Sequence, residues 1–237
     1  MNNEDYIKKN KKEIIEKFAS LLEYPSVEDP FTILMAGSPG AGKTEFSKKL
    51  IIFISEDLKN RKIVRIDADE IKKIIPGYKG KNSEKFHKAS IIGLENLFSS
   101  VLKNYQDVII DGTLCNYNKA CENINRSLKK NRAVFIYYIY QDPLIVWEFV
   151  KKREKMEGRV IPKEVFIKDF FQARDNINKL KKEFGNKICL NLIIKDLNKV
   201  DLYETKNNID NVDNYLKIKY SKEELISKLC WKKRIKK

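Results

Sequence analysis

The residues best suited to chemistry form one glycine-rich segment near the amino terminus. Residues 37–44 fit G-x-x-x-x-G-K-[ST], the pattern of a phosphate-binding loop. The predicted ATP-binding residues are Gly37, Ser38, Pro39, Gly40, Ala41, Gly42, Lys43 and Thr44. The glycines let backbone N–H groups turn toward a phosphate, Lys43 can reach the β- and γ-phosphates, and the Thr44 hydroxyl can ligate Mg²⁺. An apolar segment precedes the loop and a helical pattern follows it, so the sequence predicts a site for a nucleoside triphosphate and Mg²⁺.

Acidic residues end two further apolar segments. One segment ends in Asp67 and Asp69, and the other ends in Asp111, followed two residues later by Thr113. In open α/β sheets, ligands bind beyond the carboxyl ends of the strands. Asp69 is therefore a candidate base for an attacking hydroxyl, and Asp67 is either a second acid of the site or a helix cap. Asp111 is a candidate metal ligand of the Walker-B kind, and Thr113 either faces the same crevice or stabilises a turn.

Three of the eight arginines lie between positions 153 and 174. Gly158 and Pro162 indicate a connection between two helices, which is where P-loop kinases carry a lid. Arginines above a γ-phosphate would neutralise developing charge and exclude water. Arg159, within the connection, is the best candidate, while Arg153 and Arg174 on the flanking helices could face either the site or the solvent. An ordinary basic loop is the alternative.

The elements that must position these residues alternate along the chain. The predicted strands are residues 31–36, 62–66, 108–111, 133–140 and 188–194. The predicted helices are residues 4–23, one from about 42, then 83–103, 116–130, 143–156, 162–183 and 221–230. This order predicts an α/β fold, a P-loop NTPase or kinase-like parallel five-stranded sheet with helices on both faces. We expect a P-loop kinase domain over residues 1–196, with an N-terminal helix and linker in 1–30, and a basic C-terminal extension over 197–237.

Composition narrows the class of protein. The 237 residues carry 48 basic and 33 acidic side chains, a net charge of +15, but 40 of the basic residues are lysine. Nucleic-acid readers also rely on arginine, so a solvated lysine surface is favoured and nucleic acid is not the expected partner. No apolar run reaches the roughly 18–20 residues that cross a bilayer, and the polar start does not resemble a signal peptide. We expect a cytoplasmic protein without membrane association.

Other sequence features argue against competing sites. The four cysteines form no C-x-x-C pair and His87 is the single histidine, so neither a zinc site nor a disulfide framework is expected. Residues 198–201 match the N-K-x-D guanine motif of GTPases, but the chain has no D-x-x-G motif. A GTPase is therefore disfavoured, which leaves ATPases, nucleotide kinases and small-molecule kinases.

Taken together, these motifs make the sequence resemble the zeta-toxin family of P-loop kinases, the toxin half of epsilon/zeta-type toxin–antitoxin systems. The resemblance covers residues 31–196 and rests on four motifs in order. They are the 37–44 loop, I-D-A-D at 66–69 with P-G-Y at 76–78, I-D-G-T-L at 110–114, and G-R-V-I-P-K-E at 158–164. Asp111 stands where the family has Glu, and Gln172 lies close to where a second lid arginine is expected.

The resemblance implies ATP-dependent phosphorylation of the 3′-hydroxyl of the sugar in UDP-N-acetylglucosamine, which would block cell-wall synthesis. It implies that Asp69 is the base, that Glu95 and Thr113 help bind the sugar nucleotide, and that Arg159 is the first lid arginine. Arg174 is the candidate for the second. The catalytic set is then Lys43, Asp69, Arg159 and Arg174, with ATP and Mg²⁺ as cofactors. An antitoxin would bind at the N-terminal helix.

Two other functions remain open at this point. One is a P-loop kinase that acts on another small molecule or on a nucleotide. The other is a nucleic-acid-end kinase or nucleic-acid-binding NTPase, in which the lysine surface would hold phosphates and binding would weaken steeply with salt.

Overall fold

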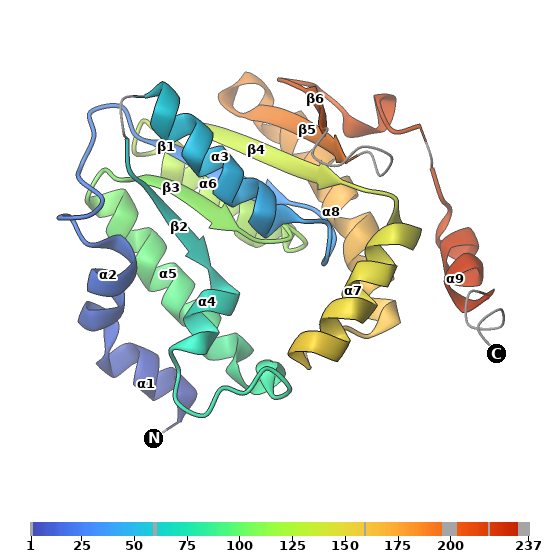
Figure 1. Ribbon diagram of the computed structural model, residues 1–237. Coiled ribbons are helices and arrows are strands. Elements are labelled where there is room, and N and C mark those ends of the chain that lie inside the picture. The colour runs from blue at the N-terminus through green and yellow to red at the C-terminus, as the bar shows by residue number, and fades with distance from the viewer. Residues whose placement is uncertain (1, 59–60, 159, 196–202, 218, 232–237) are drawn as a thin grey trace.

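A single six-stranded sheet organises the chain, as seen in a computed structural model that describes residues 2–58, 61–158, 160–195, 203–217 and 219–231 (Figure 1). The strand order is β2-β3-β1-β4-β5-β6. The strands are β1 (Phe31–Ala36), β2 (Ile63–Asp67), β3 (Asp107–Asp111), β4 (Ala133–Tyr140), β5 (Cys189–Lys195) and β6 (Tyr203–Lys206). The first five are parallel, as the sequence predicts, whereas β6 pairs antiparallel with β5. The predicted count of five is wrong because β6 is a four-residue polar edge strand without hydrophobic alternation.

Helices cover both faces of the sheet, which confirms the predicted architecture. The long helices are α3 (Lys43–Asp57), α5 (His87–Lys103), α6 (Tyr117–Leu128), α7 (Pro143–Glu157) and α8 (Lys163–Phe184). Figure 1 shows α3 across one face, with α5, α6 and α8 behind the other. The smaller apolar cluster lies under α3 and the larger lies under the other helices. Because β1 is central and almost fully buried, the loop that follows it lies in the middle of one edge of the sheet.

The N-terminal helix is in two parts, so the single predicted helix over residues 4–23 is wrong. Helix α1 (Asn3–Lys9) and helix α2 (Lys11–Ala19) are separated at Asn10. The Asn10 side chain donates a hydrogen bond to the Tyr6 carbonyl at 2.8 Å, the local competition that makes asparagine a poor interior helix residue. Ile7 and Ile14 still carry the apolar stripe into the main core.

The segment after β5 packs on the same core. Beyond β6 it contains the short 3₁₀ helix η3 (Val212–Asn214) and helix α9 (Lys222–Trp231). Val212, Leu216 and Leu225 are buried in the main cluster. The basic C-terminal part of the chain therefore contributes both a strand and apolar side chains to the domain. None of the described helices has the length and apolar character needed to cross a membrane.

Candidate active site

The phosphate-binding loop connects β1 to α3, as the motif predicts. Gly37 has φ 138°, and a Cβ there would lie 2.5 Å from the Ile139 carbonyl oxygen, so only glycine fits. The Lys43 ammonium donates to the carbonyls of Gly37 at 3.0 Å and Ser38 at 2.8 Å. The lysine thus bends back over the concave side of its own loop, where the phosphates of a nucleotide would lie. Burial lowers the pKa of Lys43, and nearby Asp111 opposes that shift.

The two predicted acidic strand ends lie side by side. In the β2–β3 ladder Asp67 is the register partner of Asp111, and the carboxylates of both contact the guanidinium of Arg65. The Asp67 carboxylate also caps helix α4 (Ala68–Lys73), because its Oδ1 accepts the Asp69 N–H at 2.8 Å. Burial raises the pKa of Asp67, and the Asp111 charge adds to that rise.

Ser47 on α3 connects the phosphate-binding loop to this acidic pair. Its hydroxyl oxygen lies 3.0 Å from the Thr44 carbonyl oxygen and 3.3 Å from Asp111 Oδ2. Within the described chain, neither the Thr44 hydroxyl nor Asp111 Oδ1 takes part in a hydrogen bond. Hydroxyl and carboxylate oxygens are the ligands that Mg²⁺ prefers, so the Thr44 and Asp111 side chains fit this ion.

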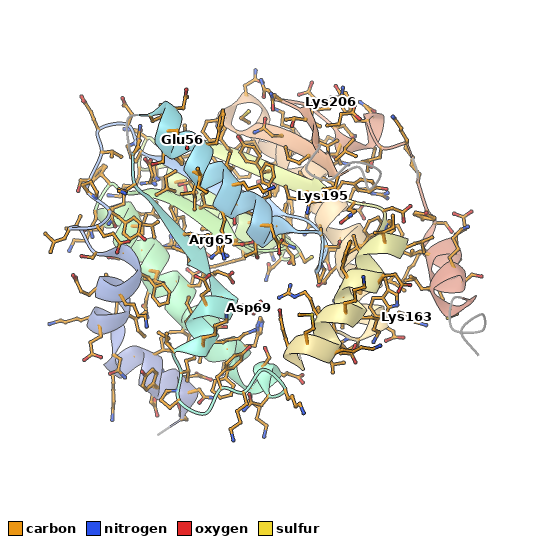
Figure 2. The ribbon with its side chains drawn as sticks, viewed as in Figure 1. Glu56, Arg65, Asp69, Lys163, Lys195 and Lys206 are labelled. Carbon is orange, nitrogen blue, oxygen red and sulfur yellow. The ribbon has the colours of Figure 1, made fainter. Side chains whose placement is uncertain are left out.

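Asp69 lies in the first turn of α4, beside Arg65 and on the side of the helix that faces α7 (Figure 2). Its side chain is 36% exposed, and its Oδ1 lies 3.1 Å from the Lys72 ammonium. Lys72 is itself buried and bonds the Ser83 hydroxyl at 3.1 Å. The lysine therefore holds a carboxylate that solvent or a substrate can still reach.

Arg153 on α7 faces the site from the other side. Burial alone would lower the pKa of its guanidinium, but Glu157, Glu45 and Asp69 outweigh burial and raise it. The Arg153 charge also acts on Lys43. A small pocket between the loop and α7 is lined by Gly40, Val150, Arg153, Glu157 and Ile161. Of the two flanking-helix arginines left open above, Arg153 is the one near the phosphate site.

Of the other two predicted lid arginines, the structure describes only Arg174. Arg159 lies outside the described residues. The guanidinium of Arg174 lies over the Phe171 ring, with its Nε 3.4 Å from an Asp213 oxygen. In the described chain, Arg174 pairs with Asp175 and Asp213 and lies over the Phe171 ring, and it forms no ion pair or ring contact with the phosphate-binding loop.

The two remaining predicted substrate residues lie in different places. The Thr113 carbonyl accepts the Gly37 N–H at 3.3 Å, so Thr113 adjoins the phosphate-binding loop. Glu95 on α5 instead faces α6, where its Oε2 lies 2.9 Å from both Arg126 and Lys119. Its Oε1 is buried and has no hydrogen-bond partner among the described residues.

The loop that follows α4 approaches the end of α7. A Cβ on Gly80 would lie 2.6 Å from the Glu157 carbonyl oxygen, and one on Gly158 would lie 2.8 Å from Lys81. Figure 1 shows this loop running from α4 toward the free end of α7. The base-bearing side of the site and the lid side are therefore in direct contact at this point.

Sequence reasoning missed three residues of this region. Ser47 and Arg65 connect the acidic pair to the loop, and the Lys195 ammonium at the end of β5 lies beside Gly42. Burial lowers the pKa of Lys195, and Glu45 partly offsets this. A signal existed for Arg65, because residues two apart on a strand share a face, which places it with Asp67. Nothing in the sequence pattern indicated the other two. The N-K-x-D string at 198–201 lies outside the described residues.

Comparison with known proteins gives a consistent assignment. Residues 16–208 match the family model described as Zeta toxin. A chain of the PezAT chromosomal toxin–antitoxin system of Streptococcus pneumoniae is similar, with a TM-score of 0.67, 19% identity, and coverage of 100% of this chain and 98% of that one. The AvrRxo1-ORF1:ORF2 complex gives a TM-score of 0.66 at 16% identity, over 88% of this chain and 70% of that one. The structure of AvrRxo1-ORF1:ORF2 with ATP gives a TM-score of 0.63 at 15% identity, over 90% of this chain and 70% of that one. At these identities the structural likeness shows the fold.

Proposed function

The chain belongs to the zeta toxin family, and from this premise we propose that it is a kinase that transfers the ATP γ-phosphate to the 3′-hydroxyl of UDP-N-acetylglucosamine. The observation that carries the proposal is the position of Arg153, which lines a small pocket together with Gly40 of the phosphate-binding loop and lies on α7, the helix toward which Asp69 faces. A phosphate-binding loop alone would suit any NTPase. A carboxylate opposite that loop, reachable from outside, suits the transfer of a phosphoryl group to a hydroxyl.

The described residues divide the proposed reaction among them. Backbone N–H groups of residues 37–44 hold the phosphates, and Lys43 exchanges the carbonyls of Gly37 and Ser38 for phosphate oxygens. Asp69 accepts the proton of the sugar hydroxyl while the hydroxyl oxygen forms a bond to the γ-phosphorus. The bond between the γ-phosphorus and the bridging oxygen of ADP breaks, and ADP leaves. Arg153, together with Arg159, neutralises the charge on the transferred group. Mg²⁺, held by Thr44 and Asp111, would screen the phosphate oxygens.

The proposed substrate contacts follow the resemblance to the zeta-toxin family. Thr113, next to the phosphate-binding loop, would contact the sugar. Glu95 on α5, whose Oε1 has no hydrogen-bond partner among the described residues, would contact the sugar nucleotide. Arg174 stays a candidate only if α8 rearranges on binding, because its side chain is held by Asp213. Both proposed substrates are cytoplasmic metabolites, so the cytoplasm is the proposed location.

An acceptor screen tests the substrate directly. Purified protein with labelled ATP and Mg²⁺ is offered UDP-N-acetylglucosamine, other UDP-sugars, nucleosides, and RNA or DNA with 5′-hydroxyl ends, and mass spectrometry locates the added phosphate. We expect a phosphate on the amino sugar and none with Lys43→Ala as the matched control. Transfer to another metabolite alone would contradict the substrate but not the kinase, and transfer to a nucleic-acid end would support the nucleic-acid kinase instead. Lack of transfer to any acceptor, a cell extract included, would contradict the kinase itself.

We also propose an antitoxin partner at the N-terminal helices. The similar PezAT structure is a toxin–antitoxin system, and Leu21 and Leu22, directly after α2, are 50% and 95% exposed here. Expression of the wild type should arrest growth, and Asp69→Asn should relieve the arrest. Equal arrest by both would show that any toxicity does not come from phosphoryl transfer.

A further inference from the structure

Arg65 occupies the centre of the acidic cluster although no catalytic motif includes it. It lies in β2, and its side chain is 9% exposed. Its Nη2 donates to Asp67 at 2.6 Å and to Asp111 at 2.9 Å, and its Nη1 donates to Glu70 at 2.7 Å. Its Nε lies 3.1 Å from the Ser47 hydroxyl. One guanidinium therefore contacts residues of β2, β3, α3 and α4.

The strand register explains how one side chain reaches so many partners. Arg65 and Asp67 are two apart on β2 and so lie on the same face of the sheet, while Asp111 is the register partner of Asp67. The planar guanidinium offers donors in a fixed fork, which suits neighbouring carboxylates better than the single ammonium of a lysine. Burial alone would lower the pKa of Arg65, but the carboxylates around it raise the pKa instead. The arginine is therefore a permanent charge in this cluster.

Each carboxylate divides its two oxygens between the arginine and a second task. Asp111 Oδ2 contacts Arg65 and Ser47, and Asp111 Oδ1 takes part in no hydrogen bond within the part of the chain that the structure describes. Asp67 Oδ2 contacts Arg65, and Asp67 Oδ1 accepts the Asp69 N–H. Arg65 thus connects the proposed metal ligand to the first turn of the helix that carries the proposed base.

We propose that Arg65 is a positioning residue of the phosphoryl-transfer site: it holds Asp111 by one oxygen so that the other stays available to Mg²⁺, and it holds Asp69 in place through Asp67. The inference rests on the proposed function, since it takes Mg²⁺ and ATP as the ligands of the loop. Residues that hydrogen-bond to a metal-ligating side chain fix its orientation, and their loss commonly reduces metal affinity or activity by roughly 10- to 100-fold.

The same strands supply a matched control at their opposite end. Arg61, just before β2, pairs with Asp107 at the start of β3, and it also contacts the Asp29 carbonyl and the Phe31 ring. Replacing Arg61 removes an arginine–aspartate pair from the same two strands, four residues away from Arg65. It removes nothing that contacts the phosphate-binding loop or α4 in the described structure.

Mg²⁺-dependent nucleotide binding tests the proposal without relying on turnover. The affinity of a fluorescent ATP analogue is measured in EDTA and across a Mg²⁺ titration for wild type, Arg65→Met, Arg65→Lys and Arg61→Met. We expect both Arg65 variants to need roughly 10- to 100-fold more Mg²⁺ for half of the metal-dependent gain in affinity. Their affinity in EDTA should equal that of the wild type, because Arg65 contacts no residue of the 37–44 loop directly. Arg61→Met should match the wild type in both conditions.

The outcomes separate a positioning role from a merely structural one. A lower melting temperature with unchanged Mg²⁺ dependence in the Arg65 variants would overturn this inference but not the proposed function. An equal rise in the Mg²⁺ concentration that Arg61→Met requires would do the same. Should Arg65→Met fail to fold, Arg65→Lys keeps the charge and decides the question by the same titration. Failure of the wild type to bind the nucleotide with or without Mg²⁺ would overturn the proposed function and this inference together.

Discussion

The same two strands, β2 and β3, carry an arginine–aspartate pair at each end, and the two pairs are used differently. At the amino end, Asp107 is fully buried and both of its oxygens are occupied. Oδ1 accepts from the Phe31 N–H at 2.8 Å and from Arg61 at 3.2 Å, and Oδ2 pairs with Arg61 Nε. At the carboxyl end, Asp111 keeps one oxygen without a hydrogen bond in the described chain. We call the Arg61–Asp107 pair the closed pair, because both carboxylate oxygens are already bonded, and its end of the strands the closed end. The Arg65–Asp111 end is the open end, because one carboxylate oxygen can still bind a ligand.

Arg132 strengthens the contrast at the amino end. It is 2% exposed, its Nε donates to the Thr32 hydroxyl at 2.8 Å, and its Nη2 donates to the carbonyls of Phe31 and Gln106. Burial lowers its pKa to about 10. At the amino end the buried Asp107 carboxylate and most of the Arg132 donors are thus satisfied within the protein, although Arg132 Nη1 and Gln106 Oε1 are buried without a hydrogen-bond partner in the described structure. At the carboxyl end the oxygen without a hydrogen bond belongs to Asp111, beside the phosphate-binding loop, where ligands bind in an open α/β sheet.

The largest effect should come from the base at the open end. Asp69→Asn keeps the shape of the side chain but removes its ability to accept a proton, so kcat should fall about 10²- to 10⁴-fold. ATP affinity and melting temperature should not change, because Asp69 lies outside the phosphate-binding loop and is partly exposed. Steady-state kinetics with a nucleotide-binding assay checks this, with Asp107→Asn as the carboxylate control that should keep kcat. Full activity of Asp69→Asn would remove Asp69 from the mechanism.

The closed pair should control stability instead. Asp107→Ala leaves Arg61 and the Phe31 N–H without their acceptor, which should lower the free energy of unfolding by about 3–5 kcal/mol. Urea denaturation measures this, and kcat of the folded variant well below its melting temperature should equal that of the wild type. Asp111→Ala should cost less stability, because Arg65 keeps Asp67 and Glu70 as partners. An equal loss of stability in both variants would contradict the contrast between the two ends.

The lid arginine offers a smaller, purely kinetic effect. Arg153 and Glu157 are each 51% exposed, so their pair contributes at most about 1 kcal/mol to stability. If Arg153 neutralises charge on the transferred phosphate, Arg153→Ala should lower kcat roughly 100-fold with little change in melting temperature. Glu157→Gln, which keeps the arginine, is the control and should retain kcat. Normal turnover by Arg153→Ala would leave Arg159 as the arginine to test next.

The smallest effect is a pH dependence of stability at the closed end. Burial raises the pKa of Asp107 above its ordinary 3.8, and the Phe31 N–H and Arg61 only partly offset this. The folded state then binds a proton more tightly than the unfolded state, so the Asp107 contribution to stability falls as pH rises above 3.8. The stability of the wild type relative to Asp107→Asn should therefore decrease as the pH of the urea series rises. An increase over that range would mean that the Arg61 pair outweighs burial.

The sequence predicted most of the structural elements whose formation depends on one contiguous stretch of residues. The β1 and β4 boundaries were predicted to the residue, and the other three parallel strands to within one residue at each end, because apolar strands bounded by polar residues give a strong local signal. The chain break at Asn10 was missed because it depends on one side chain bonding its own helix. The edge strand β6 was missed because its formation depends on pairing with β5.

Site residues follow the same division. Sequence patterns show where a buried strand ends, and ligands of open α/β sheets bind beyond the carboxyl ends of strands. This is why the site could be predicted to include the 37–44 loop, Asp67, Asp69 and Asp111. Arg174 was predicted from its position near the lid, but side-chain direction on a long helix is set by packing, and Asp213 holds it elsewhere. Arg153 and Arg174 could not be separated from the sequence, since each lies on a helix that flanks the connection and the direction of its side chain depends on packing.

By itself, the sequence determined the parallel α/β architecture, the phosphate-binding loop and the strand ends that carry carboxylates, because each depends on neighbours in the chain. Only the tertiary structure decided which arginine meets which carboxylate. Arg65 and Asp111 are 46 positions apart and meet through the β2–β3 register, and Arg61 meets Asp107 by that register at the other end. In the sequence the two pairs are alike. They differ because α3 and α4 adjoin one end of the strands, where residues of both helices share the arginine, while backbone groups fill the other end.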